Sequence, residues 1–230
     1  MVHFTLFGIP IYIRPGFWLI LAIFGGALNI SSLEGMIYPA IFVIAGFIAI
    51  LSHELGHAMV GRKLGGGHQT IVLQMFGGLT ESQGMQLTRN ERALMIVAGP
   101  MMTLLLGLVS LGIAWNAVGP TLIQNGLDIW DLALYPELAA KISTKFYILS
   151  CLIMIGTWWT VLNLLPIYPL DGGQLLAQFV KSPRKVFMTG FITAILIGLI
   201  SLQIFHSFFI PIFMALFAYS NYREYRNAPF

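Results

Sequence analysis

Two histidines and a glutamate lie within five residues of one another in an otherwise apolar stretch of the chain. His53 and His57 are four residues apart, so on a helix both lie on one face and can bind the same metal ion. Glu54 lies beside this pair, where it could reach a metal-bound water instead of the metal. The spacing therefore predicts a metal site of the kind that catalyses hydrolysis.

The stretch that holds these residues, from about 37 to 59, is long enough to cross a bilayer, for which ~20 residues suffice. Ionisable groups are costly at that depth, so a functional role is the first hypothesis for them. The alternative, buried structural histidines, has to explain two histidines and Glu54 together, with no Lys or Arg near enough to pair with the carboxylate. The segment therefore favours a functional site inside a membrane helix.

The composition is that of a membrane protein. Of the 230 residues, 57% are hydrophobic and only 9% are charged, whereas soluble domains carry about 25% charged residues. The basic residues are scattered along the chain, so we expect no nucleic-acid partner. Cys151 is the one cysteine, which excludes an internal disulfide and indicates a small core residue.

The apolar stretches predict an all-α membrane protein, a bundle of about six transmembrane helices. We expect a single integral membrane domain over residues 1–230 with a catalytic core at about 37–180. The last two stretches could instead form a re-entrant hairpin, although two crossings are preferred. The six candidate spans are 17–33, 37–60, 93–118, 146–165, 186–204 and 207–219.

The positive charges predict the orientation of the chain in the membrane. With these spans and a cytosolic N-terminus, only Lys141 and Lys145 fall on the outer side, and the other ten of the twelve Lys and Arg residues face the cytosol. Cytosolic loops carry such an excess of basic residues. We therefore expect a multi-pass protein of the cell (plasma) membrane with both termini in the cytosol and the histidine pair near the cytosolic end of its span.

A second part of the site is predicted at residues 163–173, where two prolines and two glycines interrupt any regular helix. Broken backbone at membrane depth is tolerated where it is buried in protein or lines a wet cavity. The predicted topology returns Asp171 to the level of His53 and His57, so its carboxylate can be a third metal ligand. The alternative for Asp171 is a turn residue or a helix N-cap at the membrane surface.

Together these motifs resemble the site-2 protease family of intramembrane zinc metalloproteases. The matching pieces are His-Glu-Leu-Gly-His at 53–57, Ala-Gly-Pro at 98–100 and the segment at 163–173. The chain departs from the family pattern at Thr103, where the family often has Asn nearby, and at Gln174, where a basic residue is common. Neither departure falls on a predicted metal ligand.

The resemblance implies a zinc metalloendopeptidase that binds one Zn²⁺ per chain through His53, His57 and Asp171. It also implies that Glu54 is the catalytic general base and acid, and that Asn163 helps to position the substrate or stabilise the oxyanion. The expected partners are a transmembrane protein substrate and membrane lipid, with peptide bonds cut within the membrane or at its cytosolic edge.

A β-prone segment at 70–76, followed by Gly77 and Gly78, predicts a small cytosolic β-hairpin near 70–80. A transmembrane substrate must unwind before its peptide bonds can be attacked. We hypothesise that 70–76 is an edge strand that pairs with the unwound substrate. The alternative is an ordinary hairpin that packs over the loop.

Two other functions remain open from the sequence. A membrane metal transporter would use the same side chains as transit ligands, and a non-cleaving relative would bind membrane segments without cutting them. Glu54 separates the transporter from the protease, because a transporter would use it as a ligand and a protease as a base.

Overall fold

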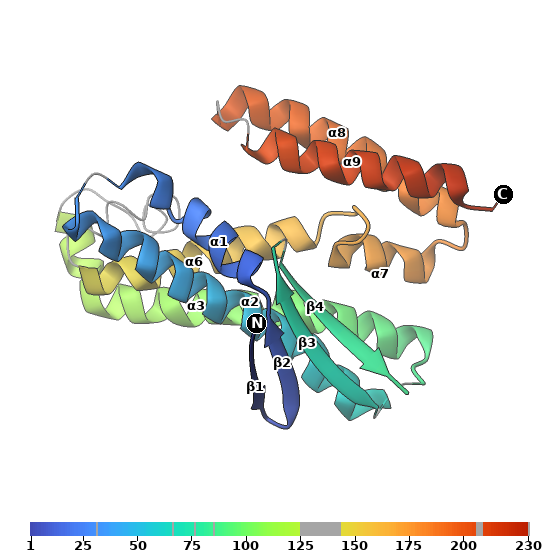
Figure 1. Ribbon diagram of the computed structural model, residues 1–230, viewed down its shortest axis with the longest axis horizontal. Coiled ribbons are helices and arrows are strands. Elements are labelled where there is room, and N and C mark those ends of the chain that lie inside the picture. Colours follow the sequence, from blue (N-terminus) through green and yellow to red (C-terminus); the bar gives the residue numbers. More distant parts are fainter. Residues whose placement is uncertain are drawn as a thin grey trace. The chain divides into compact units, whose positions relative to one another are not determined.

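The computed structural model describes residues 1–30, 32–65, 67–75, 77–84, 86–124, 144–205 and 209–229. Over these residues the chain forms seven α-helices, two short 3₁₀ turns (η1 and η2) and four strands (Figure 1). It divides into two compact units, residues 1–160 and 161–230. The elements are β1 (Val2–Leu6), β2 (Ile9–Ile13), α1 (Pro15–Phe24), η1 (Ala27–Asn29), η2 (Glu34–Met36), α2 (Ile37–Gly65), β3 (His68–Gln74), β4 (Gly77–Gln83), α3 (Arg89–Gln124), α6 (Thr144–Asn163), α7 (Asp171–Phe179), α8 (Pro183–Phe205) and α9 (Phe209–Asn227).

The four strands form one sheet in the order β1-β2-β3-β4, so the described part of the chain is mostly helical, as predicted, but not all-α. β2 pairs with β3 in parallel, and the outer pairs are antiparallel. The strands at 2–13 were not predicted, although Ile9, Ile11 and Ile13 alternate as in a half-buried strand. Phe7 and Gly8 turn the first hairpin with φ of 52° and 77°, as in a type I′ turn, where Asn or Asp usually precedes Gly.

The predicted hairpin near 70–80 is confirmed by β3 and β4, but the predicted edge strand is wrong. β3 lies between β2 and β4, with Ile11 opposite Ile71 on one side and Thr80 opposite Ile71 on the other. Both of its edges are therefore used within the chain. β4 is an outer strand among the described residues, whereas Phe76 lies outside them.

One face of the sheet packs on α1 and α2, which explains the alternation of buried and partly buried residues along β2 and β3. The core between them consists of apolar side chains that are at most 8% exposed. It comprises Ile9, Ile11, Ile13, Phe17, Leu21, Ile50, Leu51, Leu55, Ala58, Ile71 and Leu73. This core holds the sheet firmly against the helix that carries His53, Glu54 and His57.

Four helices are long and apolar enough to cross a membrane within the described ranges, namely Ile37–Gly65, Arg89–Ala117, Phe146–Asn163 and Pro183–Gln203. They correspond to four of the six predicted spans. In place of the first, α1 has 10 residues and ends before Gly25 and Gly26. In place of the last, α9 has 19 residues and carries charged side chains near its end. Lys141, used above for the orientation, lies outside the described residues.

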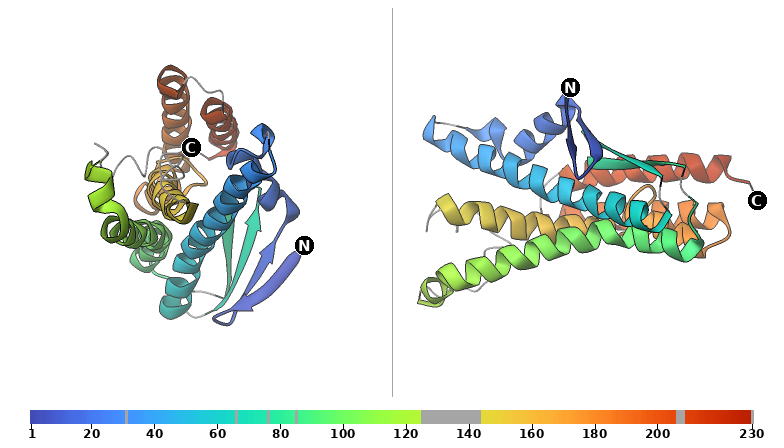
Figure 2. Two further views of the ribbon diagram at one scale, coloured as in Figure 1. Left: turned by 90° about the vertical axis from the view of Figure 1, so that its left-hand side faces the viewer. Right: turned by 90° about the horizontal axis from the view of Figure 1, so that it is seen from below.

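α2, α3 and α6 pack closely within the first unit (Figure 2). A Cβ on Gly56 of α2 would meet the backbone of Ala98 in α3, so glycine permits the two helices to approach at that point. The Thr160 hydroxyl of α6 donates to the Pro100 carbonyl of α3, at 3.3 Å. The Ala-Gly-Pro motif therefore lies where α3 meets both of its neighbours.

In the second unit, α8 and α9 lie side by side over a small apolar core (Figure 1). α6 ends at Asn163 and α7 begins at Asp171, with a non-helical segment between them. Asn221 of α9, 1% exposed, donates to the Tyr168 carbonyl at 2.6 Å and to the Phe217 carbonyl at 2.9 Å. The last helix is thereby tied to the segment that precedes Asp171.

Candidate metal centre

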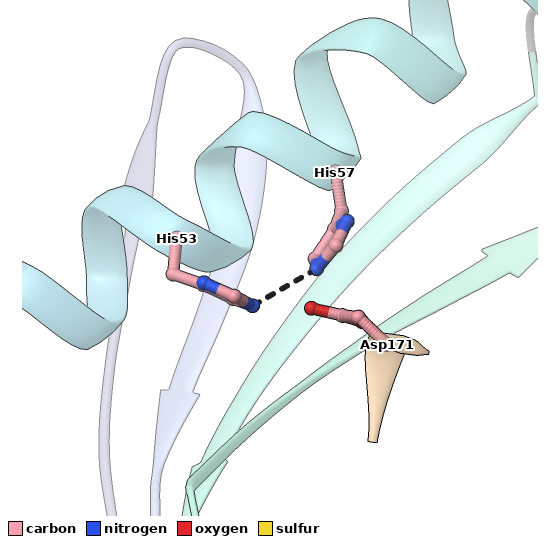
Figure 3. Close-up of side chains that lie close together, drawn as sticks. All are labelled: His53, His57 and Asp171. Atoms are coloured by element: carbon pink, nitrogen blue, oxygen red, sulfur yellow. Dashed lines mark hydrogen bonds between the residues drawn. The ribbon is translucent and has the colours of Figure 1, made fainter. Parts of the chain in front are cut away.

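His53 and His57 lie one turn apart on α2, with exposed fractions of 2% and 8%. Their rings are nearly perpendicular, at 81°, and their Nε2 atoms are 3.1 Å apart. Figure 3 shows both nitrogens directed to the same point. The prediction that this spacing brings the two imidazoles together is therefore confirmed.

Neighbours on α3 hold the Nδ1 atom of each ring. The Thr103 hydroxyl lies 2.9 Å from His53 Nδ1 and 3.0 Å from the Gly99 carbonyl. The Met95 carbonyl can only accept, so His57 Nδ1 donates to it, at 2.9 Å. The neutral His57 imidazole is therefore left with its lone pair on Nε2, and the Thr103 oxygen can accept from His53 Nδ1 when His53 Nε2 binds a metal ion.

The two Nε2 atoms, 3.1 Å apart, are held together by a cation or by a hydrogen bond between the rings. A proton shared by the two rings is one such cation, and a metal ion is another. Two nitrogens bound to a tetrahedral zinc ion are about 3.3 Å apart, given Zn–N bonds of ~2.0–2.1 Å. The observed separation therefore fits zinc without rearrangement of α2.

Asp171 begins α7 and is 6% exposed. The two glycines that follow it are required by the local backbone, because a Cβ on Gly172 would meet the Leu164 and Leu165 carbonyls. A Cβ on Gly173 would likewise meet the backbone of Ile167 and Tyr168. The Asp-Gly-Gly sequence thus lets the first turn of α7 fold back closely onto the segment that precedes it.

One ligand atom each of His53, His57 and Asp171 lies within 4.8 Å of the others, and all three residues are buried (Figure 3). Two imidazole nitrogens and a carboxylate oxygen are a donor set typical of zinc sites that leave a coordination position open. The three residues therefore fit one Zn²⁺. Glu54 is not a member of this group among the described residues.

Glu54 is 5% exposed and lies between the two histidines in sequence. The Thr80 hydroxyl of β4 donates to its Oε2, at 2.8 Å. Asn163, the last residue of α6, is 8% exposed. The roles expected for Glu54 and Asn163 are taken up under the proposed function.

Sequence reasoning missed the side chains and carbonyls that orient the ligands. Thr103 stood out only as a departure from the family pattern, and nothing in the sequence marked Met95 or Thr80. Gly99 belonged to a recognised motif, but the sequence did not show why glycine is needed there. In the structure, a Cβ at this position would meet the His57 ring.

We expect Gly99→Ala to lower the zinc affinity by about 10- to 100-fold, because the new methyl group must displace the His57 ring. Titration against a competing chelator measures the change. Gly112→Ala is the matched control, since it makes the same substitution on α3 where nothing lies within 4 Å of the new Cβ. An unchanged affinity in Gly99→Ala would contradict this account of the glycine.

Comparison with known proteins supports the same interpretation. The profile of the family described as peptidase family M50 matches residues 41–205. Zinc metalloprotease MJ0392 of Methanocaldococcus jannaschii is 30% identical over 94% of this chain and 57% of its own. Stage IV sporulation protein FB of Bacillus subtilis is 27% identical over 94% of this chain and 67% of its own.

A putative zinc metalloprotease of Synechocystis, sll0528, is 29% identical over 76% of this chain and 43% of its own. The chain thus spans about half the length of the first relatives that it matches. The solved site-2 protease from Methanocaldococcus jannaschii has the same fold, with a TM-score of 0.60 and 22% identity over 100% of this chain and 97% of that one. Since the family profile covers most of its length, including the helix with both histidines and the Asp-Gly-Gly segment, the chain belongs to peptidase family M50.

Proposed function

We propose that the protein is a zinc metalloendopeptidase that cuts transmembrane protein substrates within the membrane or at its cytosolic edge. The observation that carries this proposal is the donor set. The Nε2 atoms of His53 and His57 and the Asp171 carboxylate converge, and a buried Glu54 lies beside them and outside their group. Metal-assisted hydrolysis needs a metal site with a neighbouring carboxylate that is not itself a ligand.

In this proposal His53, His57 and Asp171 hold the ion. When bound, zinc supplies a Lewis acid that polarises a peptide carbonyl and makes water easier to deprotonate. The chain contributes two imidazoles whose Nδ1 atoms are held by Thr103 and Met95, which orients Nε2 of each ring toward the ion.

Glu54 moves the proton. Thr80 bonds its Oε2, and among the described residues nothing donates to its Oε1, which is the oxygen we assign to proton transfer. Oε1 takes a proton from the attacking water and later donates it to the amine that leaves. At 5% exposure Glu54 is shielded from bulk water, which favours transfer to and from the substrate.

To Asn163 we assign the stabilisation of the negative charge that develops on the substrate carbonyl, or the positioning of that carbonyl. Two points support this role. Asn163 matches the residue that precedes the proline-rich break in the resembled family, and its amide is largely buried, at 8% exposure.

We propose six crossings of the plasma membrane with both termini in the cytosol. The pairing of β2 with β3 supports a shared side for residues 1–13 and 68–83. α1 is about 15 Å long, half of the ~30 Å hydrocarbon core. The turns at 25–36 would therefore complete the first crossing, and α8 and α9 would make the last two.

The substrate class follows from the depth of the site. His53 and Glu54 lie within a helix of membrane-span length and composition, so lipid surrounds the protein and a membrane-spanning segment is the natural ligand. Such a segment must expose its backbone before cleavage. We place the exposed substrate backbone beside β4. This strand is an outer strand among the described residues, and its Thr80 touches Glu54.

The transporter alternative is disfavoured by the place of Glu54. A transit site would use this carboxylate as a ligand, but the metal-binding group found in the described part of the chain comprises His53, His57 and Asp171 alone. The non-cleaving alternative differs from the protease in turnover and is therefore decided by experiment.

The proposal is tested with the purified protein in phospholipid vesicles that contain a membrane-spanning reporter peptide. We expect fragments by mass spectrometry from zinc-loaded protein, none after removal of zinc by a chelator, and recovery when zinc but not magnesium is added back. Protein that binds one zinc per chain and leaves a range of such reporters intact would instead support the non-cleaving alternative.

A further inference from the structure

β4 packs against α2 at the position of Glu54. Its residues alternate between two environments: Gly78, Thr80 and Ser82 are partly buried, whereas Leu79 and Glu81 are exposed. Residues two apart in a strand share a face, so Gly78 and Thr80 both face the helix. Both of them touch Glu54.

The Thr80 hydroxyl lies near two oxygens of Glu54, the side-chain Oε2 at 2.8 Å and the main-chain carbonyl at 3.2 Å. A hydroxyl has one proton to donate. We assign this proton to the shorter contact, with the carboxylate Oε2. A donor at this position restricts rotation of the Glu54 side chain and occupies one of the two carboxylate oxygens, Oε2.

Gly78 lies against the Glu54 side chain. A Cβ there would meet Cγ, Cδ and Oε1 of Glu54, so the absence of a side chain leaves room for the carboxylate in this position. Thr80 is itself held in place, because it lies opposite Ile71 in the ladder and Ile71 is 0% exposed in the core between sheet and α2. The hydroxyl is thus presented from a rigid strand.

We infer that Thr80 is a positioning residue that holds Glu54 through Oε2 and leaves Oε1 for proton transfer. The inference rests on the proposed function, in which Glu54 transfers the proton. General bases act within narrow limits of distance and angle. A carboxylate free to rotate would spend much of its time outside those limits, which lowers kcat without changing substrate binding.

The test compares variants in the vesicle assay, with kcat, KM and zinc content measured for each. Thr80→Val keeps the shape and removes the hydroxyl, Thr80→Ala checks the same loss in a smaller side chain, and Thr80→Ser keeps the hydroxyl. Ser82→Ala is the matched control, since Ser82 lies on the same face of β4 and donates to Gln69 Oε1, at 2.6 Å, instead of to Glu54.

We expect Thr80→Val and Thr80→Ala to lower kcat by about 10- to 100-fold, with KM and zinc content unchanged. Thr80→Ser is expected to stay within about threefold of the wild type, and Ser82→Ala to equal it. The inference is overturned by a wild-type rate in Thr80→Val. It is also overturned if Thr80→Ser is as slow as Thr80→Val, if Ser82→Ala is equally slow, or if the slow variants have lost zinc.

Glu54→Gln, measured alongside, separates this inference from the function on which it rests. If Glu54→Gln cleaves slowly and Thr80→Val cleaves at the wild-type rate, only the role of Thr80 is contradicted. A Glu54→Gln of wild-type rate contradicts the assignment of the general base, and the proposed mechanism with it.

Discussion

Replacing Glu54 with glutamine is expected to lower the rate of cleavage by about 10²- to 10⁴-fold while the protein keeps its zinc. Glutamine has nearly the same shape, and Thr80 can still donate to its amide oxygen, so the surroundings need not change. The amide, however, cannot accept a proton at neutral pH. Zinc should remain because the metal-binding group of the described residues consists of His53, His57 and Asp171.

The rate is measured with the reporter peptide in vesicles, and the zinc content by elemental analysis of the same sample. Glu81→Gln is the matched control, because it makes the same chemical change on β4, on the exposed face next to Thr80. Loss of zinc in Glu54→Gln would identify Glu54 as a ligand and return the transporter to consideration. A rate above about a tenth of the wild type would contradict its role as base.

Asp171→Ala is expected to reduce zinc affinity by roughly 10²- to 10³-fold and to abolish cleavage at ordinary zinc concentrations. Binding at zinc sites amounts to ~10–16 kcal/mol spread over a few ligands, so the loss of one costs several kcal/mol. The loss also leaves the bound cation with one negative charge fewer in a buried site. Competition with a chelator of known affinity measures the change.

Gln178→Ala is the control for this variant, since it alters the same helix, α7, and removes only a hydrogen bond to Gln174 of that helix. A zinc affinity in Asp171→Ala equal to that of the control would mean that the ion does not use the Asp171 carboxylate. Partial recovery of cleavage at millimolar zinc is the further expectation, because His53, His57 and Glu54 are left in place.

The local parts of the site could be predicted from the sequence, and the non-local parts could not. Helix periodicity places His53 and His57 on one face wherever α2 lies in space. The partners of their Nδ1 atoms are residues 95 and 103 on another helix, and ordinary side chains such as Thr103 carry no mark of that use. Asp171 could be found because the prolines and glycines around it break the helix, and broken backbone at membrane depth is tolerated only where it is buried in protein or lines a wet cavity.

The sheet illustrates the same limit. The hairpin of β3 and β4 is local and was predicted, but whether β3 is an edge depends on β2, which lies about 60 residues earlier in the chain. A short strand such as 9–13 in an apolar chain also resembles the start of a membrane helix. Thr80 could not be linked to Glu54 without knowing that β4 turns back across α2.

The parallel pairing of β2 with β3 has a consequence for biosynthesis. β2 leaves the ribosome before either α1 or α2, yet its partner β3 is made only after both helices. The sheet therefore cannot form until α1 and α2 have been made. β4, which touches Glu54, is the last of its four strands to be made. A nascent chain that stalls before residue 77 would have the histidine pair but neither the strand beside Glu54 nor the third metal-binding residue, Asp171.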